Sequence, residues 1–254
     1  MNTQHKTQQS VAMSGRRRWR GLARVLAVLV VTTGLMSSAE IIAKWDFSAA
    51  GNFLLDSSGN GHQLISNNGA GWSNAAPPGS GLTGSVAFTK GGIFTMNTLN
   101  LTPYRKLRIS WWQLVQNTTA AVVFEQWING GGQLGLVTVI VNAKVGASDI
   151  AGTGSAWLNA TMPNVDFFPH LQGTANTTWE KFTVEYDLDA AGASEVVKVF
   201  NGAGVNIGTA SGMQGAAPAS FLNFQLYLGA RNQTELPLVG NLAGITIETI
   251  PAGK

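Results

Sequence analysis

Hydrophobic and polar residues alternate in short runs along much of the chain. These runs are separated by turns that are rich in Gly, Asn, Ser and Pro. Lys181–Leu188 alternates apolar and polar positions, whereas Leu134–Val141 is almost entirely apolar, as in a strand covered on both faces. No window shows the periodicity of about 3.6 residues that an amphipathic helix requires. The pattern predicts β-strands over Ile41–Phe47, Leu107–Val115, Ala121–Trp127, Leu134–Val141, Lys181–Leu188, Glu195–Phe200, Phe221–Leu228 and Leu242–Ile250.

The predicted strands follow one another without a linker long enough to divide them into two domains. This favours an all-β fold in which two antiparallel sheets pack as a jelly-roll sandwich. Two longer segments, Asn68–Gly84 and Gly146–Thr178, are expected to be loops.

The N-terminal segment differs from the rest of the chain and predicts a secretory signal. Five arginines between Arg16 and Arg24 precede an apolar run, Val25–Met36, and the small residues of Ser37–Ala39 follow it. The run is shorter than the roughly 20 residues of a membrane-spanning helix. We therefore predict a signal peptide over 1–39 and a mature domain over 40–254, with an uncleaved signal anchor as the alternative.

Charge changes the picture once this segment is removed. The whole chain carries 16 basic and 13 acidic residues, but six basic and no acidic residues lie in the predicted signal, so the mature domain has a net charge of −3. Nothing in it forms a basic stripe, which argues against a nucleic-acid partner. The chain has no cysteine, which excludes a disulfide scaffold and a cysteine nucleophile. The mature domain also lacks a second apolar run of membrane-spanning length, so we expect it to be secreted, periplasmic or on the cell surface.

A series of short motifs spans nearly all of Ile41–Ile250: Trp45–Phe47, Asp56–Gly61, Gly84–Phe88, Leu107–Trp112, Thr178–Asp187, Val197–Gly202 and Leu228–Ala230. In this order they resemble the laminin-G-like members of the concanavalin A-like lectin and glucanase domains. The resemblance implies a concanavalin A-like jelly roll. Because that fold carries lectins, adhesion modules, glycan-binding appendages and glycoside hydrolases, it implies little about activity.

An enzymatic alternative rests on the carboxylates Glu185, Asp187 and Asp189. Residues two apart on a strand share a face and lie about 7 Å apart. Retaining glycosidases need two carboxylates at about 5–5.5 Å. The resemblance to the concanavalin A-like glucanases implies an E-x-D-x-E strand here, but this chain has Asp189 in the third position. The purely structural interpretation is that Asp187 and Asp189 are solvated residues of a hairpin turn.

A calcium site is the second chemical alternative. Asp56, Ser58 and Asn60 offer oxygens at alternate positions, like the first half of an EF-hand loop. The simpler interpretation is an Asx-type turn in which Gly59 and Gly61 take positive φ. Relatives within the resembled family often carry an acidic residue where this chain has Ala243. A structural calcium ion is thus the one cofactor for which the sequence offers candidate ligands.

Glycan binding is the main functional hypothesis. Sugar rings stack on exposed aromatic side chains while amide and guanidinium groups bond their hydroxyls. Four tryptophans, Trp45, Trp111, Trp112 and Trp179, lie in predicted strands and are expected in the core or between the sheets. Two tryptophans, Trp127 and Trp157, have loop-like surroundings with polar residues near them, and a late turn adds further hydrogen-bonding groups. The candidate ligand-binding residues are therefore Trp127, Asn129, Trp157, Asn159, Arg231 and Asn232.

The sequence therefore predicts an exported, lectin-like binding or adhesion module whose partner is a glycan or another extracellular polymer. The alternatives are a glycoside hydrolase that uses Glu185, Asp187 and Asp189, and a structural cell-envelope protein without a small ligand.

Overall fold

Every regular element among the described residues is a β-strand. The structure is a computed structural model that describes residues 38–66, 69–116, 121–128, 133–142, 151–157, 165–171, 178–190, 197–209 and 220–251; between 127 and 177 it describes strand backbones only. These residues belong to one compact unit, Ser37–Lys254. This described part of the chain contains no helix with the length and hydrophobicity of a membrane span.

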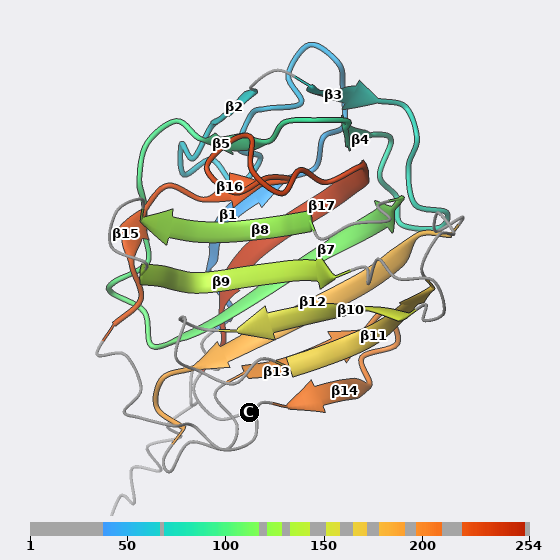
Figure 1. The fold of residues 1–254 in the computed structure, drawn as a ribbon. Helices are drawn as coiled ribbons and strands as arrows, with labels where there is room; N and C mark the ends of the chain where they lie inside the picture. The colour runs from blue at the N-terminus through green and yellow to red at the C-terminus, as the bar shows by residue number, and fades with distance from the viewer. Residues whose placement is uncertain are drawn as a thin grey trace, which may run out of the picture. The chain divides into compact units, whose positions relative to one another are not determined.

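Two antiparallel sheets form the unit, with sheet B in front of sheet A in Figure 1. Sheet A has the order β14 (Asn206–Thr209), β13 (Val197–Asn201), β12 (Glu180–Asp187), β7 (Lys106–Val115), β17 (Gly240–Thr249), β4 (Ser85–Phe88) and β3 (Ala70–Ser73), and β1 (Ile41–Trp45) also pairs with β17. Sheet B has the order β11 (Val165–Leu171), β10 (Ala151–Trp157), β9 (Gln133–Asn142), β8 (Ala121–Ile128), β16 (Tyr227–Leu228), β5 (Ile93–Thr95) and β2 (Leu64–Ser66). A small third pairing joins β15 (Asn223–Phe224) to β6 (Leu99–Asn100). The predicted all-β antiparallel sandwich is confirmed.

Strand β17 holds sheet A together. One side of it pairs with β7 along most of its length. Its other side pairs first with β4, through Gly240–Leu242, and then with β1, through Ile245–Glu248. The last strand of the described chain therefore lies in the middle of the sheet.

Alternation along β7 and β12 separates a core face from an outer face. In β7, Leu107, Ile109 and Trp111 are buried while the residues between them are partly exposed. The Trp111 ring meets the ring of Phe124 in β8 edge to face, with centroids 4.8 Å apart, and so joins the two sheets.

Two tryptophans do not lie where they were expected. Trp179 precedes β12 instead of lying in a strand, and it is partly exposed. Trp112 was expected in the core, but it lies on the outer face of sheet A, partly exposed. Successive side chains of a strand point to opposite faces, so Trp111 and Trp112 cannot both reach the core.

Three segment predictions were wrong. Asn68–Gly84 contains β3, and Gly146–Thr178 contains β10 and β11, because these poorly patterned segments find hydrogen-bonding partners in β4 and β9. Phe221–Leu228 was predicted as one strand but is two, β15 and β16, with different partners. The change occurs at Leu226, whose N–H donates to the hydroxyl of Thr95 and whose carbonyl accepts from the Thr95 N–H.

Candidate functional site

A row of alternating charges crosses the outer face of sheet A. The strand registers place Glu185 of β12 opposite Arg108 of β7, and Arg108 opposite Glu248 of β17. Lys198 of β13 is opposite Glu185 and extends the row on the other side. Directly opposed residues of neighbouring strands share a face, so these four side chains lie side by side.

Arg108 bridges the two glutamates. Its Nε donates to Glu185 Oε1 at 2.9 Å, its Nη2 donates to the same oxygen, and its Nη1 donates to Glu248 Oε1 at 3.1 Å. Burial works against the charge of this guanidinium, yet the hydrogen bonds to Glu185 and Glu248 hold the pKa of Arg108 above its ordinary value. The three groups form one fixed, hydrogen-bonded cluster.

An open groove of about 390 Å³ lies over this cluster. Its wall is formed by residues of four strands and of the turn between β13 and β14: Arg108, Ser110, Lys181, Thr183, Glu185, Phe200, Asn201, Gly202, Gly204 and Glu248. A second hollow of about 310 Å³ shares Lys181, Asn201 and Gly202 with it. The second hollow also touches Phe182 and Ile207, which face the core side, so the two hollows adjoin each other near the turn after β13.

The groove offers hydrogen-bonding groups and one aromatic ring. Ser110 and Thr183 point their hydroxyls outward, and neither hydroxyl bonds to another described residue. Phe200 is partly exposed and lies opposite Thr183. At the margin, Lys181 Nζ lies 5.9 Å from the ring centroid of Trp112, within the range of a cation–π contact.

The three carboxylates of the hydrolase alternative do not converge. Glu185 lines the groove, but Asp187 is paired with Lys106 Nζ at 2.9 Å and Asp189 with Arg105 Nε at 2.9 Å. Asp187 Oδ1 also accepts the N–H of Asp189, which closes the turn after β12. The second carboxylate of the groove is Glu248, which the sequence analysis did not single out.

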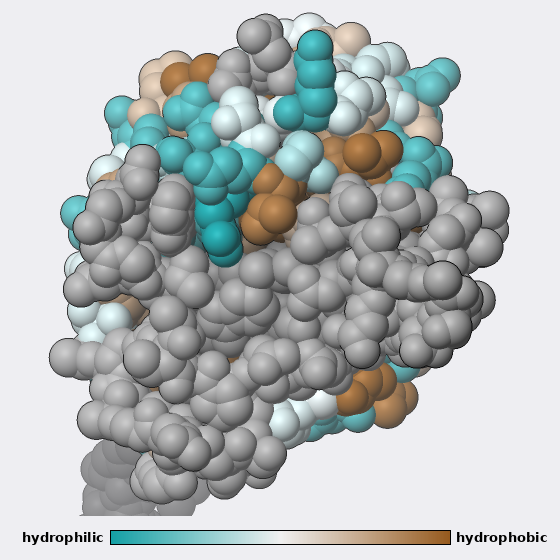
Figure 2. Space-filling model, in the orientation of Figure 1, coloured by the Kyte–Doolittle hydropathy of each residue, from teal (hydrophilic) through white to brown (hydrophobic). Residues whose placement is uncertain are grey.

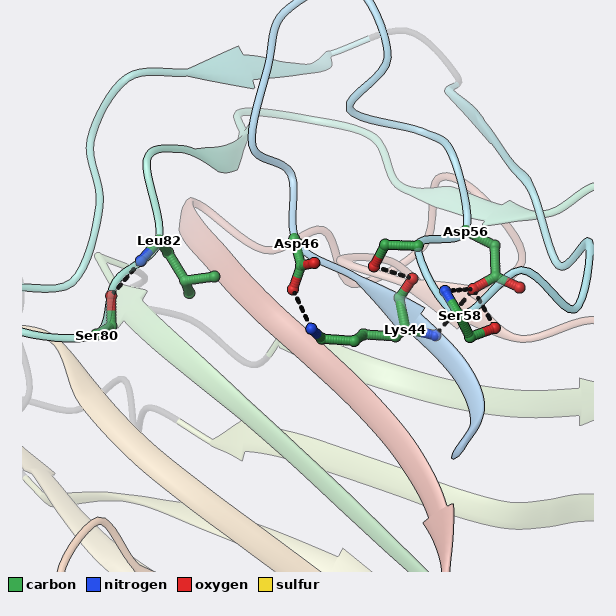
Figure 3. Close-up of polar contacts among 7 residues, drawn as sticks. Lys44, Asp46, Asp56, Ser58, Ser80 and Leu82 are labelled. Atoms are coloured by element: carbon green, nitrogen blue, oxygen red, sulfur yellow. Dashed lines mark hydrogen bonds and ion pairs between the residues drawn. The ribbon is translucent and has the colours of Figure 1, made fainter. Parts of the chain in front are cut away.

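Asp56, Ser58 and Asn60 form the Asx-type turn. The Asp56 carboxylate accepts hydrogen bonds from the N–H groups of Lys44 and Ser58 and from the Ser58 hydroxyl (Figure 3). It also accepts the N–H of His62. Asn60 Nδ2 donates to the carbonyls of Ile41 and Ile42. These bonds fasten the turn to β1. Among the described residues, no group of three or more Asp, Glu, His or Cys side chains is arranged around a metal-sized space, and a bound calcium ion stays a prediction.

Arg231 is engaged with sheet B. Its Nε lies 2.9 Å from Glu125 Oε1, and its Nη2 lies 3.2 Å from Glu125 Oε2. Glu125 is fully buried in β8, two residues before Trp127. Burial raises the pKa of the Glu125 carboxyl above its ordinary value, although the hydrogen bonds from Arg231 work against that rise. Arg231 thus holds its turn against β8, and a ligand contact there stays a prediction.

The other predicted glycan contacts can be placed only in part. Asn232 follows Arg231 with φ +45°, in a turn that the Arg231–Glu235 bridge closes. The side chains of Trp127 and Trp157, and Asn129 and Asn159 as a whole, lie outside the described residues. On this face of the molecule the described surface over β5 and β16 combines hydrophilic residues with small hydrophobic areas (Figure 2).

Sequence reasoning missed Arg108, Ser110, Phe200 and Glu248 as groove residues. A signal was present for each, because alternation within its strand places it on the face opposite the core. What was missing was the register that brings Glu248 beside Arg108, which is 140 residues away in sequence.

No protein-family model matches the chain, and no curated protein matches it in sequence. Solved structures do share its fold. One is domain 4 of AbnA, a GH43 extracellular arabinanase from Geobacillus stearothermophilus, in complex with arabinotriose; it has a TM-score of 0.55 and 15% identity, over 84% of this chain and 94% of that one. Another is the binding domain of Paraclostridial Mosquitocidal Protein 1, with a TM-score of 0.56 and 11% identity over 84% of this chain and 49% of that one.

A third is the ligand binding domain of botulinum neurotoxin serotype D in complex with N-acetylneuraminic acid, with a TM-score of 0.51 and 11% identity over 84% of this chain and 48% of that one. The chain thus spans about half the length of the two toxin domains. At these identities the likeness shows the fold alone, a two-sheet β-sandwich. Membership of the laminin-G-like family remains a prediction.

Proposed function

We propose that this chain is an exported carbohydrate-binding module and that its ligand lies in the groove on sheet A. The observation that carries the proposal is the groove itself, in which hydroxyl, carboxylate and guanidinium groups surround one partly exposed ring, Phe200. Sugars are recognised by this combination, because a ring face packs on the apolar face of a sugar while polar groups bond its hydroxyls.

Two further observations support the proposal. The fold is that of a domain solved in complex with arabinotriose, and the likeness extends over 94% of that domain. The predicted N-terminal signal would bring the module to the outside of the cell, where polymeric glycans are found.

The groove favours binding over hydrolysis. A retaining hydrolase holds the glycosidic bond between two carboxylates about 5–5.5 Å apart. Here Arg108 lies on the strand between Glu185 and Glu248 and bonds to both. Its guanidinium occupies the place where the reacting bond would have to lie.

A glycan array followed by titration calorimetry tests the proposal, with and without calcium. We expect at least one oligosaccharide to bind, and we expect Phe200→Ala to weaken binding by about tenfold or more through the loss of stacking. Phe94→Ala is the matched control, because Phe94 is a partly exposed ring on the outer face of sheet B, beside Tyr227.

The outcomes separate the alternatives. Binding that Phe94→Ala abolishes and Phe200→Ala leaves unchanged would move the site to sheet B. The absence of binding to every glycan would contradict the proposal and favour a structural cell-envelope protein.

A further inference from the structure

We propose that the groove on sheet A selects uncharged oligosaccharides and excludes acidic ones. This inference rests on the proposed function and names the chemical class of its ligand. Its starting point is the balance of charge in the groove wall, where Arg108 and Lys181 stand against Glu185 and Glu248. The wall therefore has no net charge with which to attract an anion.

The strongest anion-binding group of the groove is already occupied. Arginine recognises carboxylates and sulfates through two parallel N–H groups of its guanidinium. In Arg108, Nε and Nη2 both donate to Glu185 and Nη1 donates to Glu248. An acidic sugar would have to displace one of these glutamates and leave a partly buried carboxylate without its partner, which is unfavourable.

The glutamates themselves present acceptors to the groove. Both contacts with Arg108 use Oε1, and neither Oε2 bonds to another described residue. The Oε2 atoms accept hydrogen bonds from sugar hydroxyls but repel a carboxylate or sulfate at the same distance. The neighbouring hydroxyls of Ser110 and Thr183 can donate or accept, which suits neutral hydroxyl groups equally well.

The two lysines near the cluster do not reverse this preference. Lys181 lies at the margin, against the Trp112 ring and between the two hollows. Lys198 stands next to Glu185 in the row of charges but does not line the groove. The centre of the groove is therefore formed by Arg108 with a carboxylate on each side.

The shape of the two adjoining hollows favours a chain of sugars over a single ring. The two hollows share Lys181, Asn201 and Gly202, and each is within the size of small-molecule sites, roughly 300–1,000 Å³. The turn after β13 contributes Gly202 and Gly204, which have no side chains, to the wall near Phe200. A linear oligosaccharide with one ring on Phe200 would extend from the groove toward the second hollow near the turn after β13.

The test compares neutral oligosaccharides (arabinan, glucan and galactan fragments) with acidic ones (oligogalacturonate, sialylated and sulfated sugars) on the full-length protein by calorimetry. We expect a neutral oligosaccharide to bind at least about tenfold more tightly than any acidic one. We also expect its affinity to change by less than about twofold between roughly 50 and 500 mM NaCl, because no net charge is neutralised on binding.

Glu248→Gln provides the second arm, since it keeps the size of the side chain but removes one of the two charges that balance Arg108. It should raise the affinity for an acidic sugar about fivefold or more relative to the neutral one. Glu235→Gln is the control, because it changes the net charge equally at an exposed turn next to sheet B. Thermal unfolding checks that both variants are folded.

The inference would be overturned if the wild type preferred acidic sugars, or if the two substitutions changed the ratio of acidic-sugar to neutral-sugar affinity equally. Either result would leave carbohydrate binding intact. If no sugar of either class binds, the proposed function fails together with the inference.

Discussion

Asp56 shows how one carboxylate organises a turn at the edge of the core. Burial alone would raise its pKa, but hydrogen bonds from Ser58, His62 and Lys44 hold the pKa of Asp56 below its ordinary value. The carboxylate is therefore easier to ionise in the folded chain than in the unfolded chain. Its contribution to stability is complete above an ordinary carboxyl pKa of about 3.9 and is lost as the pH falls through the lower, folded value.

We accordingly expect Asp56→Ala to lower the free energy of unfolding by roughly 2–4 kcal/mol at pH 7, because four hydrogen bonds to the carboxylate disappear. Urea denaturation of the variant and the wild type at several pH values measures this, and the difference should shrink below about pH 4. Asp46→Ala removes only the Lys44–Asp46 ion pair and should lower the free energy of unfolding by less than about 1 kcal/mol. Equal losses would contradict the role of the turn, and a calcium-dependent rise in Tm that Asp56→Ala abolishes would reveal a metal site there.

Strand β16 is followed by a glycine, Gly229, at a position that has no room for a side chain. Gly229, directly after β16, has φ +75°, and a Cβ atom there would lie 2.3 Å from the Phe88 ring of β4. The strand of one sheet can approach the other sheet this closely only because that Cβ is missing.

Gly229→Ala should lower the free energy of unfolding by roughly 2–5 kcal/mol, since it combines left-handed backbone strain with overpacking. Gly81→Ala is a matched control: its φ is +77°, and a Cβ atom there would have no neighbour within 4 Å. It should cost about 1–2 kcal/mol from backbone strain alone. Chemical denaturation of the two variants measures the difference, and equal values would show that Phe88 moves aside.

For the whole molecule, the position of β17 predicts the effect of a truncation. A chain ending at Val239 lacks β17, so β7 and β4 each lose one of their two paired neighbours, and β1 loses the strand with which it pairs. We expect this chain to show no cooperative unfolding transition and no near-UV circular dichroism, whereas a chain ending at Pro251 should unfold like the full-length protein. A cooperative transition in the shorter chain would mean that sheet A can form without β17.

The same non-local pairings explain how far the sequence could predict this structure. Alternation along Leu107–Val115 and Lys181–Leu188 was enough to find β7 and β12, although it was not applied to Trp112, which was expected in the core and lies on the outer face. It could not show that Arg108 meets Glu185 and Glu248, because register depends on pairing between residues 77 and 140 positions apart. Nor could it divide Phe221–Leu228, because the division depends on hydrogen bonds between Leu226 and Thr95.

The pairing of β1 with β17 also determines where the two ends of the sandwich lie relative to the groove. Ile41 lies opposite Glu248, and Glu40 and Thr249 exchange hydrogen bonds, so the chain enters and leaves the unit at neighbouring points. Glu248 is at the same time part of the groove wall. With the proposed function, a segment fused at either end would be tethered near the groove, and a polymer bound there would be kept within reach of whatever that segment carries.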